Sequence, residues 1–179
     1  MSTIEIRRAV REDAVPLATL AEQTFRDTFS AQNTVEDIEA YAAESFAPAQ
    51  VEAELVDESS TFLVADAGGP LLGYAKLRQD RVEACVTGSA PVELERLYVH
   101  TDAIGQGLGA TLMRACLDWA GEAGFETLWL GVWERNERAI AFYERWQFET
   151  VGSHVFRLGS DDQTDLIMQR PVAELGSSE

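Results

Sequence analysis

The chain has 179 residues, 46% of them hydrophobic, and its formal net charge at pH 7 is −17. This length suits one domain with a proper core, so we expect a single folded unit over residues 1–172 and a polar C-terminal tail over 173–179. Such an acidic chain disfavours nucleic acid and anionic membranes as partners, because both bind basic surfaces. It suits a cationic substrate, although acidic surfaces also simply keep proteins soluble.

The N-terminus and the cysteines exclude further classes. Residues 1–5 show no basic segment followed by an apolar one, and no run approaches the ~18 apolar residues of a membrane span. We therefore expect a cytoplasmic protein. Cys85 and Cys116 are the only cysteines, with no CxxC spacing and no histidine cluster. We expect buried free thiols, without a disulfide scaffold or a metal site.

The first 57 residues carry signals for one strand and three helices. Ile4 and Ile6 alternate with charged residues, as in a half-exposed strand. Asp13 offers a helix N-cap with Pro16 in the first turn, and Thr34 begins a sequence like a capping box. The predicted segments are a strand over 3–8 and helices over 14–29, 34–44 and 48–57.

The rest of the chain alternates β-rich runs with helical stripes. Residues 61–79 predict a hairpin around a Gly-Gly-Pro turn, followed by a loop over 80–91. Gly73 lies within the second strand of this hairpin, which indicates that another group approaches the backbone closely there. The remaining predictions are strands over 92–99, 127–133, 150–158 and 164–169, and helices over 111–124 and 137–146.

Three glycines at every second position lie where a strand leads into a helix. Gly105, Gly107 and Gly109 let the backbone take positive φ and approach a ligand without a Cβ in the way. The helix N-terminus that follows leaves N–H groups without intrahelical partners and carries about half a positive charge. This junction suits a phosphate group, although a plain turn before a helix has the same appearance.

Two other phosphate-binding classes fit the glycines poorly. A P-loop NTPase requires Lys-Ser/Thr after the glycines, and none follows. A dinucleotide oxidoreductase finds an acidic residue after the next strand in Glu134, but the glycine spacing is not GxGxxG.

The order of elements, together with Leu97-Tyr98-Val99, the loop 104–109 and Asn136-x-x-Ala139-x-x-Phe142-Tyr143, resembles the GNAT superfamily of N-acetyltransferases over almost the whole chain. The resemblance implies an α/β (α+β) fold: one domain with a mixed, mostly antiparallel twisted sheet of about seven strands and helices on both faces. A narrower likeness is to the PaiA-like spermidine/spermine acetyltransferases. Its motifs are Phe25-Arg26-Asp27-Thr28-Phe29, residues 131–140, Gly152-Ser153-His154 and Gln163-Thr164-Asp165.

The resemblance implies acetyl-CoA as cosubstrate, with no metal. Main-chain groups of 97–99 would pair with its pantetheine arm, and amides of 105–110 would hold its pyrophosphate. Ile104 stands where the family has Arg or Gln, but backbone amides hold the phosphates in such a loop, so we expect binding to survive. Asn136 either contacts the cofactor or only caps its helix. The expected cofactor contacts are Leu97, Tyr98, Val99, Ile104, Gly105, Gln106, Gly107, Leu108, Gly109, Ala110, Asn136, Ala139 and Tyr143.

Direct transfer to an amine needs a base, because an ammonium with a pKa near ~10.4 is almost fully charged at pH 7. Glu93 and Glu95 are two residues apart, so both point from one face of their strand. Glu93 matches the position where some relatives place a base, and either carboxylate could act through water or attract a cationic substrate. Tyr143 occupies the family's general-acid position, with core packing as the alternative. Gln147 replaces a glycine that commonly ends this helix in the family, so we expect a different helix end.

Acceptor contacts are expected from the first two helices, which border the acceptor pocket in relatives. The acceptor implied is a small-molecule primary amine, with a polyamine as the narrower reading and a peptide or protein amine as the alternative. A non-catalytic CoA-binding sensor is the alternative of another class, and the assembly stays open, a homodimer included. His100 and His154 lack the partners of a nucleophilic triad. The acceptor candidates are Phe25, Thr28, Phe29 and Tyr41, although core packing explains the phenylalanines equally well.

Overall fold

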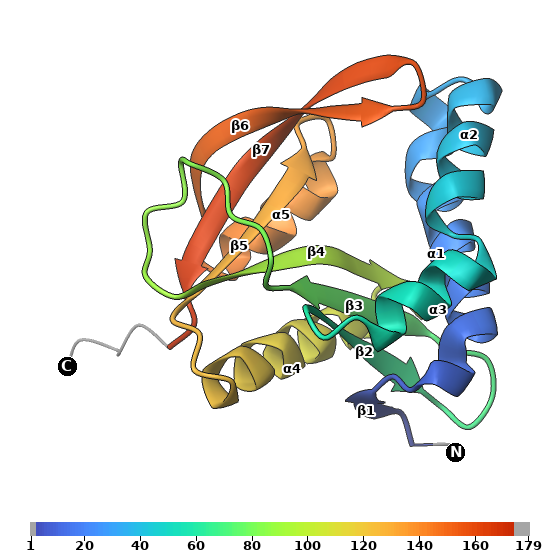
Figure 1. The fold of residues 1–179 in the computed structure, drawn as a ribbon, viewed down its shortest axis with the longest axis horizontal. Helices are drawn as coiled ribbons and strands as arrows, with labels where there is room; N and C mark the ends of the chain where they lie inside the picture. The colour runs from blue at the N-terminus through green and yellow to red at the C-terminus, as the bar shows by residue number, and fades with distance from the viewer. Residues whose placement is uncertain (1–2, 174–179) are drawn as a thin grey trace.

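A seven-stranded sheet organises the computed structural model, which describes residues 3–173 (Figure 1). Its strand order is β1-β2-β3-β4-β5-β7-β6, and β4 and β5 form the parallel pair among antiparallel neighbours. The expected fold class is confirmed. The elements are β1 (Glu5–Arg8), α1 (Ala14–Phe29), α2 (Val35–Ser45), α3 (Pro48–Val56), β2 (Ser60–Asp66), β3 (Gly73–Arg78), β4 (Pro91–Val99), α4 (Leu108–Glu122), β5 (Thr127–Trp133), α5 (Glu137–Arg145), β6 (Glu149–Leu158) and β7 (Asp161–Pro171).

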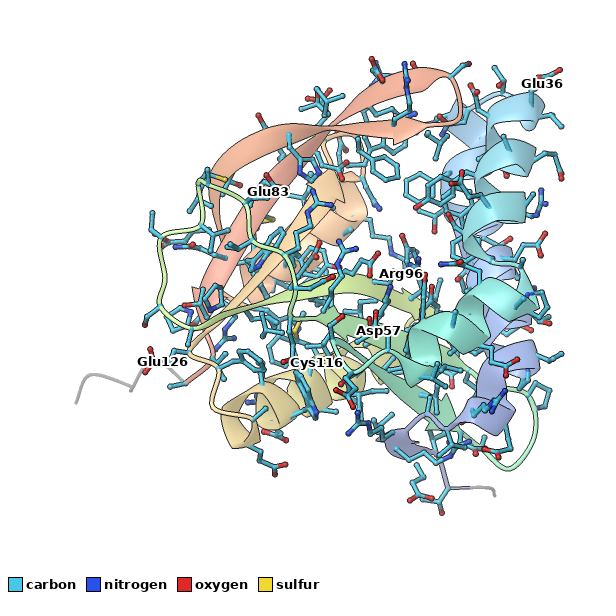
Figure 2. All side chains as sticks on the ribbon, viewed as in Figure 1. Glu36, Asp57, Glu83, Arg96, Cys116 and Glu126 are labelled. Carbon is cyan, nitrogen blue, oxygen red and sulfur yellow. The ribbon has the colours of Figure 1, made fainter. Side chains whose placement is uncertain are left out.

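Helices cover both faces of the sheet, and each face has its own core. On one face α1, α2 and α3 bury aromatic and aliphatic side chains against β2 and β3. On the other face α4 and α5 pack against β3, β4 and β5. Figure 2 shows Arg96 on the α1–α3 side of the sheet and Cys116 on the α4 side. Successive side chains along a strand point to opposite faces of the sheet, so a single strand can contribute to both cores.

The strands β4 and β5 pair only at their beginnings and then separate. Their register ends after Pro91–Thr127, Val92–Leu128 and Glu93–Trp129, although β4 runs on to Val99 and β5 to Trp133. Figure 1 shows the two strands diverging beyond this point. The later part of β4 therefore has main-chain groups on its β5 side that the sheet does not use.

An extra residue in β4 changes which side chains share a face. Lys76 pairs with Arg96, but the next residue, Leu77, pairs with Leu94, so Glu95 is the additional residue of a β-bulge. Arg96 therefore reaches Glu54 of α3 at 3.2 Å, and its guanidinium lies over the ring of Phe46, which follows α2. In a regular strand Glu95 and its neighbour would point to opposite faces. The bulge places both charges on the α1–α3 side.

Several local expectations are confirmed. Thr34 caps α2 by accepting a hydrogen bond from the Asp37 N–H at 3.2 Å. A Cβ at Gly73 would lie 3.0 Å from Leu112 Cδ1 and 3.1 Å from the Tyr98 carbonyl oxygen, so the close approach predicted there is present. No helix of residues 3–173 is long and apolar enough to cross a membrane. Residues 174–179 of the expected tail lie outside the described part of the chain.

Other expectations are wrong in detail. Asp13 precedes α1 but does not cap it, because its carboxylate accepts hydrogen bonds from the Val10 N–H at 2.8 Å and from Arg7 at 2.8 and 2.9 Å. Cys85 is only half-buried. Gln147 takes the left-handed conformation after all, with φ +67°, so α5 ends as the family's glycine would have ended it. Helix α4 begins at Leu108, three residues earlier than expected.

Candidate active site

A cleft of about 810 Å³ lies between the glycine loop, the end of β4 and α5. We call it the loop cleft. Every residue expected to contact the cofactor lines it except Gln106, whose exposed side chain donates to the Asp102 carbonyl at 2.9 Å. The glycine loop, the end of β4 and α5 therefore build one continuous concave surface. The residues of this set that line it are Leu97, Tyr98, Val99, Ile104, Gly105, Gly107, Leu108, Gly109, Ala110, Asn136, Ala139 and Tyr143.

The glycine loop keeps backbone N–H groups accessible. Gly105 and Gly107 have φ values of +83° and +80°, and a Cβ on either would meet open space. Because α4 begins at Leu108, the N–H groups of 108–110 have no intrahelical acceptor. Ile104 is 40% exposed and brings an apolar side chain to the cleft in place of a charge. The loop thus offers amides and a helix dipole to an anion.

Two arginines that the sequence analysis did not single out also line the loop cleft. Arg138 and Arg145 are seven residues apart on α5, which is about two helical turns, so they share a face. Both are exposed, and neither forms an ion pair with another residue in the described part of the chain. In a chain of net charge −17 they supply local positive charge next to the loop. Their spacing is the sequence signal that could have identified them.

A second, smaller cavity of about 230 Å³ lies behind the loop cleft, and we call it the inner cavity. One part of its wall is aromatic and includes three of the acceptor candidates, Phe25, Phe29 and Tyr41. The fourth, Thr28, lines the loop cleft instead, and its hydroxyl donates to the Thr24 carbonyl. The two cavities share five lining residues and therefore meet: Leu97, Tyr98, Asn136, Ala139 and Tyr143.

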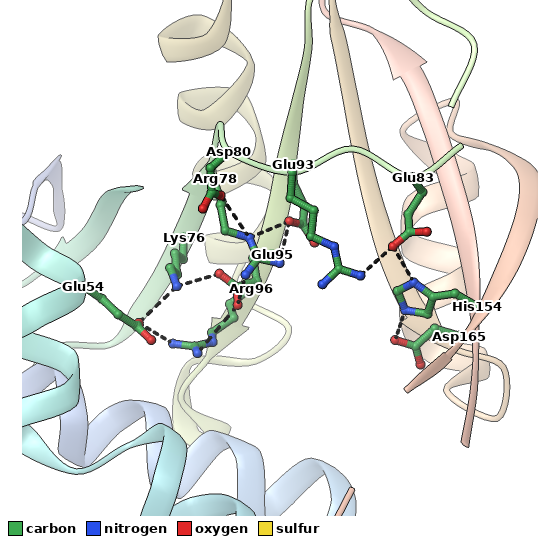
Figure 3. Close-up of polar contacts among 11 residues, drawn as sticks. Glu54, Lys76, Arg78, Asp80, Glu83, Glu93, Glu95, Arg96, His154 and Asp165 are labelled. Carbon is green, nitrogen blue, oxygen red and sulfur yellow. Dashed lines mark hydrogen bonds and ion pairs between the residues drawn. The ribbon is translucent and has the colours of Figure 1, made fainter. Parts of the chain in front are cut away.

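Glu93 and Glu95 both line the inner cavity, but in different charge environments (Figure 3). Glu93 is 5% exposed and pairs with Arg78 at 2.7 Å. Burial raises the pKa of Glu93, and Arg78 opposes that rise. Glu95 is half-buried, and this burial acts to raise its pKa, but the charges of Arg96, Lys76 and Arg78 outweigh burial and lower it. Its closest cation is Lys76 at 2.6 Å.

Tyr143 lies where the two cavities meet. Burial raises the pKa of its phenol, and the nearby Cys116 adds to that rise, so the hydroxyl stays protonated well above neutral pH. Asn136 lines both cavities as well, and its side chain caps α5 by accepting from the Ala139 N–H at 3.2 Å. Asn136 thus caps α5, and its contact with the cofactor stays a prediction. Both residues are positioned by the start and the inner face of α5.

The inner cavity also contains a histidine and a carboxylate from the C-terminal strands. His154 Nδ1 lies 3.0 Å from Glu83, and its Nε2 lies 3.4 Å from Asp165. Asp165 and His154 line the cavity. With both ring nitrogens facing carboxylates, His154 has no free nitrogen for a substrate proton. Among residues 3–173 no group of His, Cys, Asp and Glu side chains is arranged to hold a metal ion.

Comparison with known proteins identifies the fold and the family. The model of the acetyltransferase (GNAT) family matches residues 20–148. An uncharacterised N-acetyltransferase of Mycobacterium tuberculosis is 33% identical over 161 residues, which are 89% of this chain and 98% of the relative. The spermidine N(1)-acetyltransferase of Thermoplasma acidophilum is 25% identical over 172 residues, which are 94% and 97% of the two chains.

A solved structure extends the likeness to three dimensions. The PaiA N-acetyltransferase of Thermoplasma acidophilum in complex with coenzyme A superposes with a TM-score of 0.75 at 25% identity, covering 94% of this chain and 99% of that one. The expected similarity to PaiA-like enzymes is therefore confirmed in both sequence and fold. Since the family model spans more than half of the chain, this protein belongs to the GNAT family of N-acetyltransferases.

Proposed function

We propose that this protein transfers the acetyl group of acetyl-CoA to a primary amine, and that the acceptor is a polyamine. The observation that carries the proposal is the meeting of two cavities at Tyr143. One cavity contains an anion-binding loop and two arginines, and the other contains buried carboxylates and aromatic rings. The similar PaiA structure contains coenzyme A, which supports the acetyl donor. A further relative is a spermidine N(1)-acetyltransferase, which supports the acceptor class.

The residues of the loop cleft fit a CoA thioester. Amides of 108–110 would hold the pyrophosphate, with Arg138 and Arg145 as nearby counter-charges. The unused main-chain groups of 97–99 would pair with the amides of the pantetheine arm, because β5 has already turned away. Bound in this way, the thioester supplies the acetyl group at the point where the two cavities meet.

We assign the proton transfers to Glu93 and Tyr143. Glu93 accepts, through a water molecule, the proton that the acceptor ammonium must lose before its nitrogen attacks the thioester carbon. Burial makes this carboxylate a stronger base than an exposed one. Tyr143 gives its phenolic proton to the sulfur as the carbon–sulfur bond breaks, and solvent restores that proton. Glu95 is held by Lys76 and Arg78 and keeps its charge without acting as the base.

The test is an amine panel with release of free CoA as the readout. Spermidine, spermine, short alkylamines and a peptide N-terminal amine are each incubated with acetyl-CoA and the full chain, and the products are identified by mass spectrometry. We expect acetylation of the small amines, with the polyamines preferred. Because acetyl-CoA is a cytoplasmic metabolite, we propose that the reaction takes place in the cytoplasm.

Three other results would reject parts of the proposal. Acetylation of the peptide alone would replace the polyamine with a peptide or protein amine. Tight binding of acetyl-CoA without CoA release on any amine would favour a non-catalytic CoA sensor. Binding of NAD without acetyl-CoA binding would reject the transferase assignment for this chain.

A further inference from the structure

Charged side chains form a continuous series along one wall of the inner cavity, which we call the charged belt (Figure 3). It begins at α3, crosses β3 and β4, and ends on β6 and β7. Lys76 and Arg96 each lie within ion-pair distance of both Glu54 and Glu95. From Glu95 onward, successive members lie within ion-pair distance of each other, apart from the step between Glu93 and Arg81, where the two charges still interact. Its members are Glu54, Lys76, Arg96, Glu95, Arg78, Glu93, Arg81, Glu83, His154 and Asp165.

Four of the five carboxylates in the charged belt are paired with a permanent cation. The carboxylates on α3 and β4 form ion pairs with Lys76, Arg78 and Arg96, at distances down to 2.6 Å. Glu83 is paired with Arg81 at 2.5 Å. Asp80 adds a further negative charge 3.9 Å from Arg78, on a largely exposed side chain. Asp165 is therefore the carboxylate of the charged belt that has no lysine or arginine partner within residues 3–173.

Asp165 has only a long contact to an imidazole within residues 3–173. Its Oδ2 lies 3.4 Å from His154 Nε2, whereas a charge-assisted N–H···O bond measures about 2.7–2.9 Å. An imidazole is not a permanent cation, and this ring lies closer to Glu83, at 3.0 Å. The Asp165 side chain is only 13% exposed. Burial raises the pKa of its carboxyl, and His154 compensates only in part.

The structure leaves space beside this carboxylate. Gly131 of β5 lines the inner cavity next to it, and a Cβ there would lie 3.4 Å from Asp165 Oδ2 and 3.6 Å from His154 Nε2. The strands β5, β7 and β6 place Trp133, Asp165 and His154 side by side in register. The carboxylate is thus held on a rigid sheet and faces a cavity that continues to Tyr143.

We propose that Asp165, positioned by His154, is the subsite that binds a second positively charged nitrogen of the acceptor. The inference rests on the proposed amine acetylation. It specifies that the preferred acceptors are diamines and longer polyamines, with the reacting nitrogen near Tyr143 and the distal ammonium at Asp165. An ammonium supplies the charge and the N–H donors that this buried carboxylate lacks. The paired carboxylates elsewhere in the belt attract a cation less strongly, because each already has one.

The experiment compares diaminoalkanes of four to eight carbons with alkylamines of the same length, which lack only the distal ammonium. The variants are Asp165→Asn and, as the matched control, Asp162→Asn. Asp162 lies on the same strand with its side chain 61% exposed and paired with Arg157, outside both cavities. For wild type and the control, kcat/KM of the best diamine should exceed that of its alkylamine by about 10- to 100-fold. In Asp165→Asn the preference should fall to the factor of two given by two equivalent amino groups.

Binding measured by calorimetry in the presence of CoA separates this subsite from the proposed reaction. If neither amine is acetylated but the diamine binds more tightly than the alkylamine only when Asp165 is present, the subsite stands and the acetylation proposal fails. If both amines are acetylated with equal kcat/KM, or Asp165→Asn keeps the diamine preference, the subsite is rejected and the acetylation proposal stands. Failure of the wild type to bind any diamine also rejects the subsite.

Discussion

Arg78 and Glu93 lie opposite each other on β3 and β4, with guanidinium and carboxylate 2.7 Å apart. The pairing holds a carboxylate that is only 5% exposed at the wall of the inner cavity. Burial and the arginine act on this carboxyl in opposite directions, and burial prevails, so its pKa is raised. The Glu93 carboxylate is therefore more basic than an exposed glutamate, which favours a role as general base.

Replacing this carboxylate tests the assignment directly. Glu93→Gln should lower kcat by about 10²- to 10⁴-fold, the usual contribution of general-base catalysis, with a small effect on the KM for acetyl-CoA. In the wild type, activity should fall as the pH drops through the raised pKa of Glu93, because protonation removes the base. That acidic limb of the kcat profile should be absent from the residual activity of the variant.

The control for this variant is Glu122→Gln, on an exposed side chain at the end of α4 outside both cavities. It should leave kcat and the pH profile unchanged. Near-normal kcat in Glu93→Gln, with the acidic limb intact, would assign that limb to another group.

Tyr143→Phe should lower kcat by about 10²-fold while binding of acetyl-CoA is preserved, since the ring packing against Phe142 and Phe148 stays. The raised pKa of the phenol means that wild-type kcat should show no loss from its ionisation up to about pH 10. Stopped-flow measurement of CoA release at saturating acetyl-CoA checks both points. Unchanged kcat in the variant would leave Tyr143 with a packing role only.

Tyr74→Phe is the matched control for the same chemical change. Tyr74 is completely buried between Phe62 and Tyr98, and its hydroxyl has no hydrogen-bond partner among the described residues. Removing an unpaired buried hydroxyl should leave kcat unchanged and raise the free energy of unfolding by about 1 kcal/mol. Urea denaturation measures the second effect, and a destabilised variant would indicate that the hydroxyl has a partner.

The order of strands and helices could be predicted because each element carries its own pattern. Hydrophobic periodicity and Pro or Thr at the helix starts are local, and α2 begins where Thr34 predicts it. The bulge at Glu95 could not be predicted, because it depends on the register with β3. The prediction that Asp13 caps α1 was wrong for a similar reason. The arginine that binds the Asp13 carboxylate comes from β1 and not from α1.

The residues of the loop cleft were easier to predict from the sequence than those of the inner cavity. The loop cleft is built largely from two short segments, and every residue expected to contact the cofactor lines it except Gln106. The cofactor contacts themselves stay a prediction. The inner cavity combines residues far apart in the chain, such as Phe25 and Asp165. The ring of His154, which also lines it, contacts Glu83, a residue 71 positions away in the chain. Nothing near His154 in the sequence indicates that its ring faces Glu83. Arg78 was not predicted as the partner of Glu93 either, because it lies 15 positions earlier, on the neighbouring strand.

The arginines of α5 should contribute to donor binding. Arg138→Gln and Arg145→Gln should each raise the KM for acetyl-CoA about 3- to 10-fold and leave kcat nearly unchanged, because a phosphate contact holds substrate and transition state alike. Each variant should also show a weaker dependence of KM on salt. Arg157→Gln, on a side chain that is 70% exposed and distant from the loop cleft, is the control. Equal salt dependence in all four proteins would exclude both arginines from the phosphate site.

The contact between Arg7 and Asp13 should make stability depend on pH. The hydrogen bonds from Arg7, opposed by burial and helped by the Val10 N–H, lower the pKa of Asp13 in the folded state. A carboxyl with a lowered pKa stabilises the fold above its unfolded pKa of about 3.9, and that stabilisation is lost as the pH falls through the folded value. Asp13→Asn should therefore cost about 1–3 kcal/mol at pH 7 and progressively less below pH 4.

Urea midpoints of wild type and Asp13→Asn between pH 7 and pH 3 measure this difference. Arg7 keeps Asp66 at 2.9 Å in the variant, so the cost should stay within that range and the fold should persist. Asp162→Asn, which removes an exposed carboxylate, should change the free energy of unfolding by no more than about 0.5 kcal/mol at any pH. A cost for Asp13→Asn that is the same at pH 7 and pH 3 would mean that Asp13 stabilises the fold by packing and not through its charge.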